Sequence, residues 1–418
     1  MPNNEANMNF KDKTALIIDF SGENLEHAVT HAKEYKHVYY YTSWEADHSF
    51  RDRAVGMGMA KNITKVEEYW HYMDTADLIA YVDIGGEGEA HYLKTHKRPD
   101  GSSYPLYGAG LGERLERERA ASHKIQEAIG LKSPPFTSVK GVKALRDHFS
   151  SNPDEYVKSD TTTRADLETW HAFHPEAIEI MLNNIEAGSG PYKEDREFLV
   201  EKAIKADMEV GFDAFFSGHQ FLRPIMWGVE RGRPYAGKFS DKLPDYMEEY
   251  ITKISSILRD LDYRGAISTE FRDEFCCDLT CRFPSPLGII HTKALENYCD
   301  VIWACAHKQI VKLRPASKYV LGCNIKCDYG DEHWLPLLIP KEYKDNVTLF
   351  GACRKGELDY IVPGQSGQIY IVVFGESIDK LYDQVAKIAE SIEGHEIDAS
   401  PLYHLSKAIA DVKKIEGF

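Results

Sequence analysis

The sequence predicts a mixed protein, with an α/β region first and α+β regions in the rest of its 418 residues. Apolar runs at 14–20, 37–43 and 76–84 alternate with helix-like segments, which is the order of a parallel sheet with crossover helices. Two later runs, 265–272 and 275–283, are joined by a tight turn, as in an antiparallel hairpin. One core rarely supports a chain of this length, so we expect several domains.

The composition is that of a soluble globular protein, with 43% hydrophobic and 28% charged residues. No window approaches the length of an apolar membrane span, and MPNNEANMNFKDK lacks the apolar segment of a signal peptide. We therefore expect a cytoplasmic protein with no membrane partner. The net charge of −16, from 50 Lys and Arg against 66 Asp and Glu, disfavours a nucleic-acid partner. It suits an enzyme that holds anionic substrates in a local basic pocket with divalent cations.

Two turns of the predicted parallel sheet carry glycine and acidic residues. Ser21, Gly22 and Glu23 follow the first strand, and residues 85–89, GGEGE, follow the third. Ligands of open α/β sheets bind beyond the carboxyl ends of the strands, so both turns are candidate substrate loops. Each motif taken alone is more often an ordinary turn, and neither is a GxGxxG or Walker loop.

The remaining segments alternate between helix-like and strand-like patterns. We expect helices over residues 111–130, 139–149, 251–263, 287–308 and 378–392. We expect further strands over residues 155–160, 196–204, 209–218, 319–327, 346–353 and 368–374.

The hairpin around FCCDLTCRFPSP, residues 275–286, places carboxylates opposite each other. With the turn centred on Glu274, Glu270 faces Asp278, and side chains alternate between the two faces. One face then carries Glu270, Arg272, Cys276, Asp278, Thr280 and Arg282. The other face carries Phe271, Cys277, Leu279, Cys281 and Phe283. Facing carboxylates destabilise a sheet, so we expect a cation between them.

The three cysteines of this stretch offer an alternative, a zinc or redox site. Structural zinc takes four converging ligands. Alternation points Cys276 away from Cys277 and Cys281, and no CxxC or nearby histidine completes a set. We therefore expect buried free thiols. Because all eight cysteines lie between residues 276 and 353 of a chain with cytosolic features, we expect no disulfide framework.

In the order of its elements the chain resembles the ATP-grasp superfamily and, within it, the phosphoribosylamine–glycine ligases (glycinamide ribonucleotide synthetases). DLTCRF, residues 278–283, stands where that family has acidic-x-Asn-Cys-Arg-Phe. SGENLEHA, ADLIAYVDIGGEGEA and the segment 351–392 also resemble the family. The resemblance implies an ATP-grasp fold with three domains. These are an N-terminal Rossmann-like (pre-ATP-grasp) domain over 1–112, an ATP-grasp domain over 113–310 with lobes of about 113–195 and 196–310, and a C-terminal α+β domain over 311–418.

The resemblance also implies ATP and Mg²⁺ (or Mn²⁺) as cofactors and assigns roles to single residues. The residues implied at the nucleotide are Lys124, Lys158, Glu201, Lys202, Ala203 and Glu209. The implied metal ligands are Glu270, Asp278 and Thr280. Arg282 and Lys158 would neutralise the transferring phosphoryl group, as electrostatic catalysis requires. The residues implied at the other substrate are Ser21, Gly22, Glu23, Gly86, Glu87 and Arg282.

The implied reaction is an ATP-dependent carboxylate–amine ligation through an acyl phosphate. It would join an amino acid to a ribosylamine- or nucleotide-like amine. Two departures from the family favour a changed partner. Ser159–Arg164 contains no glycine where the family has its glycine-rich phosphate loop, and 228–244 lacks the family's Gly-Gly-Met-Gly stretch. A divergent phosphoribosylamine–glycine ligase of purine synthesis and a catalytically silent nucleotide-binding relative remain alternatives.

Overall fold

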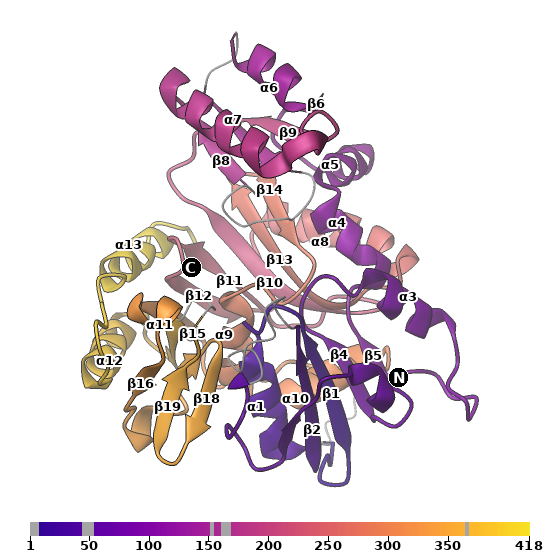
Figure 1. Cartoon of the computed structure of the whole chain (residues 1–418), viewed down its shortest axis with the longest axis vertical. Coiled ribbons are helices and arrows are strands. Elements are labelled where there is room, and N and C mark those ends of the chain that lie inside the picture. The colour runs from indigo at the N-terminus through magenta and orange to yellow at the C-terminus, as the bar shows by residue number, and fades with distance from the viewer. Residues whose placement is uncertain (1–7, 44–53, 151–153, 160–168, 364–367) are drawn as a thin grey trace.

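The computed structural model describes residues 8–43, 54–150, 154–159, 169–363 and 368–418. Most of the glycine-free loop predicted at the phosphates, residues 160–164, lies outside the described residues. The described strands form four sheets, which Figure 1 shows with the first sheet at one end of the molecule and a small helix-covered sheet at the other. Within this part of the chain, no helix is both long and apolar enough to cross a bilayer.

The first sheet is parallel throughout, as predicted, because its strands alternate along the chain with helices. Its strand order is β3-β2-β1-β4-β5. The strands are β1 (Thr14–Asp19), β2 (His37–Thr42), β3 (Ile63–Lys65), β4 (Leu78–Tyr81) and β5 (Leu106–Tyr107). Their connections contain α1 (Leu25–Glu34), η1 (Tyr69–Tyr72) and α3 (Glu87–Thr95). All of β4 is buried, as expected of a parallel strand covered on both faces.

A second, four-stranded sheet has a hydrophobic core of its own, built with α6 and α7. Its strands, in the order β6-β9-β7-β8, are β6 (Phe136–Lys140), β7 (Glu155–Ser159), β8 (Thr169–Ala172) and β9 (Glu197–Lys202). Its helices are α6 (Val142–Phe149), α7 (Pro175–Ser189) and the 3₁₀ turn η4 (Gly190–Tyr192). We call this unit the small lobe. β9, which the sequence analysis grouped with the second ATP-grasp lobe, pairs inside the small lobe.

The largest sheet joins the middle of the chain to its last hundred residues. Its order is β14-β13-β10-β11-β12-β15-β20-β17, so it continues across the predicted domain division at residue 310. Its strands are β10 (Val210–Ser217), β11 (Ile225–Glu230), β12 (Tyr235–Ser240), β13 (Arg264–Arg272), β14 (Phe275–Thr280), β15 (Tyr319–Lys326), β17 (Val347–Leu349) and β20 (Gln368–Gly375). Helices around it are α8 (Asp245–Asp260), α9 (Leu287–Ala294), α10 (Tyr298–Ala306), α12 (Ile378–Ser391) and α13 (Leu402–Val412).

A three-stranded sheet lies beside α11 and α12 in Figure 1. It contains β16 (Leu335–Leu337), β18 (Ala352–Lys355) and β19 (Leu358–Ile361), with α11 (Tyr329–Glu332) and η5 (Lys341–Tyr343) nearby in the chain. The strand predicted over 346–353 is therefore wrong as one element. Its first half, β17, pairs with β20 of the largest sheet, and its second half begins β18.

Several predicted helices differ in their bounds from the observed ones, and the helix predicted over 251–263 is α8, which begins at Asp245 and ends at Asp260. The helix predicted over 111–130 is divided into η2 (Gly110–Glu113), α4 (Arg114–Arg117) and α5 (Arg119–Ala128), because Glu118 leaves the helical conformation at φ −97° and ψ 65°. The helix predicted over 287–308 is interrupted by the extended Leu295. The helix predicted from residue 139 begins at Val142, since Gly141 has a φ of 90°.

Candidate active site

The hairpin of β13 and β14 places Glu270 directly opposite Asp278, as predicted. Closer to the turn the register shifts, so that Phe271 pairs with Cys276 and Cys277 is the extra residue of a bulge. The predicted faces of these two cysteines are therefore wrong. Cys276 is buried in the core, whereas Cys277 lies on the side of Lys158, whose ammonium group hydrogen-bonds the Cys277 carbonyl.

The two facing carboxyl groups have pKa values shifted in opposite directions. Burial and the neighbouring carboxylates of Asp278 and Glu209 raise the pKa of Glu270 to about 8. Burial also disfavours the charged form of Asp278, but Arg119 and Lys158 outweigh it and lower that pKa. The Arg119 guanidinium lies 3.9 Å from an Asp278 oxygen. The site therefore holds Asp278 ionised, whereas Glu270 is mostly protonated at neutral pH and would ionise when a cation lies beside it.

Lys158, predicted at the phosphates, lies on β7 with its ammonium group buried between the small lobe and the hairpin. Its Nζ lies 3.2 Å from Oε2 of Glu201, and Oε1 of Glu201 lies 2.9 Å from Nε2 of His123. Burial lowers the pKa of Lys158, but Asp278 and Glu201 outweigh this effect and raise it. The lysine is thus a fixed cation, connecting one carboxylate of the small lobe to the hairpin.

The other residues predicted at the nucleotide lie on α5 and along the connection between β9 and β10. Lys124 lies on the exposed side of α5, while Arg119 and His123 are buried on the side that faces Asp278 and Glu201. β9 ends at Lys202, and Ala203 begins the connection to β10. Glu209 lies at the other end of that connection, 3.0 Å from the Arg272 guanidinium. These positions agree with a hinge over residues 201–203, which stays a prediction.

Arg282 joins the hairpin to the loops of the parallel sheet. Its Nε donates to Glu116 over 3.1 Å and lies 3.9 Å from Asp83, which follows β4. Burial opposes the charge of Arg282, but Glu116 and Asp83 outweigh it and raise the pKa. Glu116 also accepts a hydrogen bond from the Cys281 amide at 2.7 Å. Arg282 is therefore held between the β13–β14 hairpin and the candidate substrate loops.

The loop of Ser21, Gly22 and Glu23 is organised by a buried carboxylate, Asp19. Oδ1 of Asp19 accepts hydrogen bonds from the Gly22 amide at 3.1 Å and the Ser21 hydroxyl at 3.3 Å. Gly22 has a φ of 77°, a backbone conformation that favours glycine because it has no side chain. The Ser21 amide donates to Asp83 at 3.0 Å, so this loop and the turn after β4 are joined.

Asp19 should make stability depend on pH. Burial, with the charge of Asp83, raises its pKa to about 7, so the folded state binds a proton that the unfolded state releases near pH 4. The stabilisation is complete below about pH 4 and is lost as the pH rises through about 7. We expect Asp19→Asn, which mimics the protonated acid, to show a smaller fall in unfolding free energy over this range. Urea unfolding of both proteins at several pH values measures the difference, and parallel curves would contradict it.

In the second predicted substrate loop, Gly86 and Glu87 both make contacts within the protein. Glu87 begins α3 and accepts from Arg114 at 2.6 Å, with Arg117 at 3.4 Å. A Cβ at Gly86 would lie 2.4 Å from the Tyr81 ring, so this position requires glycine. Glu87 therefore orders the approach to α4, and Gly86 permits close packing; the structure adds no direct support for ligand contact by either.

Sequence reasoning missed several charged groups of the site, namely Asp83, Glu116, Arg119 and His123. The last three lie on the segment 111–130, where their spacing resembles ordinary charged positions of a surface helix. The sequence does not mark the helix break at Glu118. This break decides which way the side chains of α4 and α5 point. An alternating acidic and basic pattern with three arginines and one histidine was the available signal.

All eight cysteines are free thiols, and burial raises the pKa of each one. The pKa of Cys277, the cysteine beside Lys158, is raised to about 11. Such thiols are protonated at neutral pH and are poor nucleophiles and ligands.

A divalent cation fits the pair of Glu270 and Asp278. Mg²⁺ in nucleotide sites is commonly held by one or two carboxylates together with phosphate oxygens. In the described part of the chain, no three His, Cys, Asp or Glu side chains converge on a common metal position. The two facing carboxylates offer oxygen donors of the kind that Mg²⁺ takes, and a cation between them would favour the ionised form of Glu270, whose pKa is raised first by burial and then by Asp278 and Glu209.

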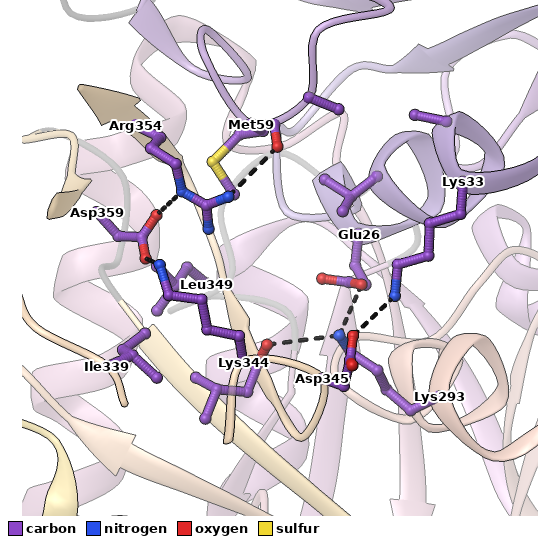
Figure 2. A pocket seen from close by; sticks show the side chains of 14 residues that line it. Glu26, Lys33, Met59, Lys293, Ile339, Lys344, Asp345, Leu349, Arg354 and Asp359 are labelled. Carbon is purple, nitrogen blue, oxygen red and sulfur yellow. Dashed lines mark hydrogen bonds and ion pairs between the residues drawn. The ribbon is translucent and has the colours of Figure 1, made fainter. Parts of the chain in front are cut away.

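A second charged hollow lies between α1, α9 and the strands near residue 350 (Figure 2). Its volume is about 220 Å³, and its cations are paired with carboxylates. The buried pair is Lys293 and Glu26, 2.7 Å apart, and Glu26 also accepts from the Thr348 hydroxyl at 3.1 Å. The pair therefore joins α1 to α9, and the Thr348 hydrogen bond joins α1 to β17 of the largest sheet.

Removing one partner of this pair should be costly. We expect Lys293→Met to lower the free energy of unfolding by about 3–5 kcal/mol, because Glu26 keeps a buried charge without its cation. Lys33→Met is the matched control, since Lys33 and Asp345 form an exposed pair in the same hollow. Its expected cost is about 0–1 kcal/mol. Denaturant unfolding of both variants tests this, and equal costs would contradict it.

Comparison with known proteins supports the fold. No family model matches the chain, and no curated protein matches its sequence. Among solved structures, phosphoribosylamine–glycine ligase from Thermotoga maritima matches with a TM-score of 0.66 and 14% identity, over 92% of this chain and 98% of that one. An ADP complex of N5-carboxyaminoimidazole ribonucleotide synthetase matches with a TM-score of 0.59 and 14% identity, over 97% of this chain and 100% of that one.

A biotin carboxylase from Campylobacter jejuni, solved as a beta-gamma-ATP complex, is a third structure of this kind. Its TM-score is 0.62 at 11% identity, and the match covers 96% of both chains. The likeness extends over nearly the whole length of each protein, and identities this low establish the shared fold. The chain therefore has the ATP-grasp fold that its sequence predicts.

Proposed function

We propose that this protein is an ATP-dependent ligase that joins a carboxylate to an amine through an acyl phosphate. The observation that carries the proposal is the facing pair of Glu270 and Asp278, with Lys158 and Arg119 beside it, in a fold shared with proteins solved as nucleotide complexes. A carboxylate pair beside fixed cations is suited to a metal–triphosphate group, whose negative charge must be neutralised on several sides.

Each predicted residue has a place in this proposal. Lys158 binds a phosphate of ATP, and the ribose and adenine lie along the connection between β9 and β10. The residues proposed at the nucleotide are Lys124, Lys158, Glu201, Lys202, Ala203 and Glu209. Glu270 and Asp278 hold the cation, with Thr280 as a further oxygen donor on the same strand. When bound, Mg²⁺ or Mn²⁺ supplies Lewis-acid neutralisation of the phosphate oxygens.

The chemistry needs two displacements. A carboxylate oxygen of the acid substrate attacks the γ-phosphorus, the bond to the β-phosphate oxygen breaks, and ADP leaves with an acyl phosphate formed. The amine then attacks the acyl carbon, the carbon–phosphate oxygen bond breaks, and inorganic phosphate and a proton are released. Lys158 and Arg282 balance the charge of the transferring phosphoryl group. Positioning and electrostatics supply the catalysis, and no nucleophilic side chain is required.

The position of Arg282 supports a second substrate at the loops of the parallel sheet. Arg282 contacts Asp83, and Asp83 binds the Ser21 amide, so the phosphoryl site and this loop adjoin. We propose that a ribosylamine- or nucleotide-like amine docks there. The residues proposed for it are Ser21, Gly22, Glu23, Gly86, Glu87 and Arg282.

ADP release tests the proposal. Purified protein with Mg-ATP should release ADP and phosphate when a suitable amino acid and an amine-bearing ribosyl or nucleotide compound are both present, and the product should contain a new amide by mass spectrometry. Glycine with phosphoribosylamine identifies the alternative of a divergent phosphoribosylamine–glycine ligase. Binding of Mg-ATP without ADP release across the whole panel would overturn the proposal in favour of a silent nucleotide-binding relative.

A further inference from the structure

A further cavity lies beside the start of β13, and its charged lining is basic. Its volume is about 340 Å³, near the lower end of the range of about 300–1,000 Å³ that is common for small-molecule sites. The basic side chains that line it are Lys94, Arg264, His307 and Lys308, and none of its described lining residues is acidic. We call it the basic cavity. Its lining is suited to a small anion.

Three cations of the basic cavity come from different elements and are positioned by one residue, Asp262. Lys94 lies on α3, Arg264 begins β13, and Lys308 follows α10. The Arg264 Nε donates to Oδ1 of Asp262 at 3.1 Å, and the Nζ of Lys308 lies 2.7 Å from the same oxygen. Lys94 donates to the Asp262 carbonyl at 2.7 Å and to the Ala109 carbonyl at 3.0 Å. Contacts within the protein thus hold these cations together around the cavity.

Each of the three cations keeps N–H donors beyond these contacts. A guanidinium group has five N–H donors, and an ammonium group has three. Asp262 and the Ala306 carbonyl, which lies 3.4 Å from a terminal nitrogen of Arg264, receive three of the guanidinium donors. Among the described residues, Lys94 donates to two acceptors and Lys308 to one. Unused donors on three elements around one cavity suit a ligand with several acceptor atoms.

The charge around the basic cavity also favours an anion. Asp262 balances one of the two charges of Arg264 and Lys308. The carbonyl end of α10, which carries about half a negative charge, balances part of the other. Burial, opposed by Asp262 and aided by Arg264 and Lys308, lowers the pKa of Lys94 to about 7. A bound anion would hold Lys94 in its charged form, and even with Lys94 neutral these groups leave no excess of negative charge to repel it.

We propose that the basic cavity binds a phosphate group, either inorganic phosphate or the phosphate of a small ester. A phosphate group carries a charge of about −1.5 to −2 at pH 7 and several strong acceptor oxygens. It can therefore accept hydrogen bonds from cations on three elements at once. A simple carboxylate has two acceptor oxygens and a single charge, so it matches this set of donors less well.

This site is separate from the proposed ligase site. Arg264 begins β13 and Glu270 lies near its other end, about 20 Å away at about 3.4 Å per residue. A bound phosphate would connect α3, which begins at Glu87 in the second predicted substrate loop, to the strand that carries Glu270. The inference therefore goes beyond the proposed function, and the failure of either one leaves the other standing.

Calorimetric titration of the full chain, without nucleotide or metal, tests the phosphate site. The probes are inorganic phosphate, glycerol 3-phosphate and acetate. We expect at least one phosphate probe to bind about tenfold or more tightly than acetate, and the tighter of the two identifies free phosphate or an ester as the occupant. Lys308→Met should weaken phosphate binding by about tenfold or more, because it removes one charged donor.

Lys143→Met is the matched control, since it removes the same charge from an exposed position on α6 of the small lobe and should leave phosphate binding unchanged. Lys94→Met should weaken binding as Lys308→Met does. If Lys94→Met fails to fold, Lys308→Met decides alone, because the Lys308 side chain is 40% exposed.

Three results would overturn the inference. One is the absence of phosphate binding by the wild-type protein, and another is equal affinity for acetate and both phosphate probes. The third is an unchanged phosphate affinity in Lys308→Met, which would place the phosphate elsewhere in the protein, for example at Lys158.

Discussion

Asp278→Asn should reduce turnover by about 100-fold or more, as should Glu270→Gln, while the fold is retained. Asp278→Asn removes the ionised carboxylate of the facing pair, Glu270→Gln removes the carboxyl group that a bound cation would ionise, and both changes keep the size of the side chain. The loss follows from the proposed role, since removal of one fixed electrostatic group from a water-excluded site commonly costs about 10²–10³ in rate. Steady-state ADP release measures the effect, and circular dichroism with denaturant unfolding verifies the fold.

The matched control for these variants is Glu274→Gln. Glu274 lies in the turn of the same hairpin and forms an exposed pair with Lys132. We expect its activity to be close to that of the wild type. Near wild-type turnover in Asp278→Asn or Glu270→Gln would refute the metal assignment.

Lys158→Met should combine a loss of turnover with a loss of stability. The ammonium group of Lys158 compensates the buried Glu201 and contributes to the charge balance of Asp278. Breaking a buried ion pair by removing one partner typically costs about 3–5 kcal/mol, because the other charge stays buried. We therefore expect a lower free energy of unfolding and weaker binding of Mg-ATP in the variant.

A double variant separates the two effects. Lys158→Met combined with Glu201→Gln removes both charges of the pair and should recover much of the lost stability. It should not recover turnover, because the cation proposed at the phosphates is still absent. Recovery of both properties would show that Lys158 acts only in the structure.

The sequence predicted the sheets better than the direction of individual side chains. Alternating apolar runs identified the parallel sheet and the β13–β14 hairpin, and a simple count placed Glu270 opposite Asp278. The count failed at Cys276 and Cys277 because a bulge adds a residue to one strand, and no local pattern marks it. The bulge did not affect the prediction of Glu270 and Asp278, which lie on its far side from the turn.

Two other parts of the site depended on tertiary structure. Glu116 and Arg119 read as charges of one surface helix, yet the break at Glu118 and the packing against β14 bury both. Asp213 reads as an isolated acid within an apolar strand. In the structure it lines one small cavity together with Glu230 and Tyr235, which lie on other strands. Pairing between distant segments set these features, and sequence spacing carries no information about it.

The continuity of the largest sheet has a consequence for how the molecule unfolds. One hydrophobic core runs from α1 through β10–β15 to α12 and α13, whereas the small lobe has a separate core. Strands β15, β17 and β20 complete the sheet that carries the hairpin, so the C-terminal hundred residues are not a detachable module. We therefore expect two cooperative units: the small lobe can unfold locally, while α1, the largest sheet and helices α12 and α13 unfold together.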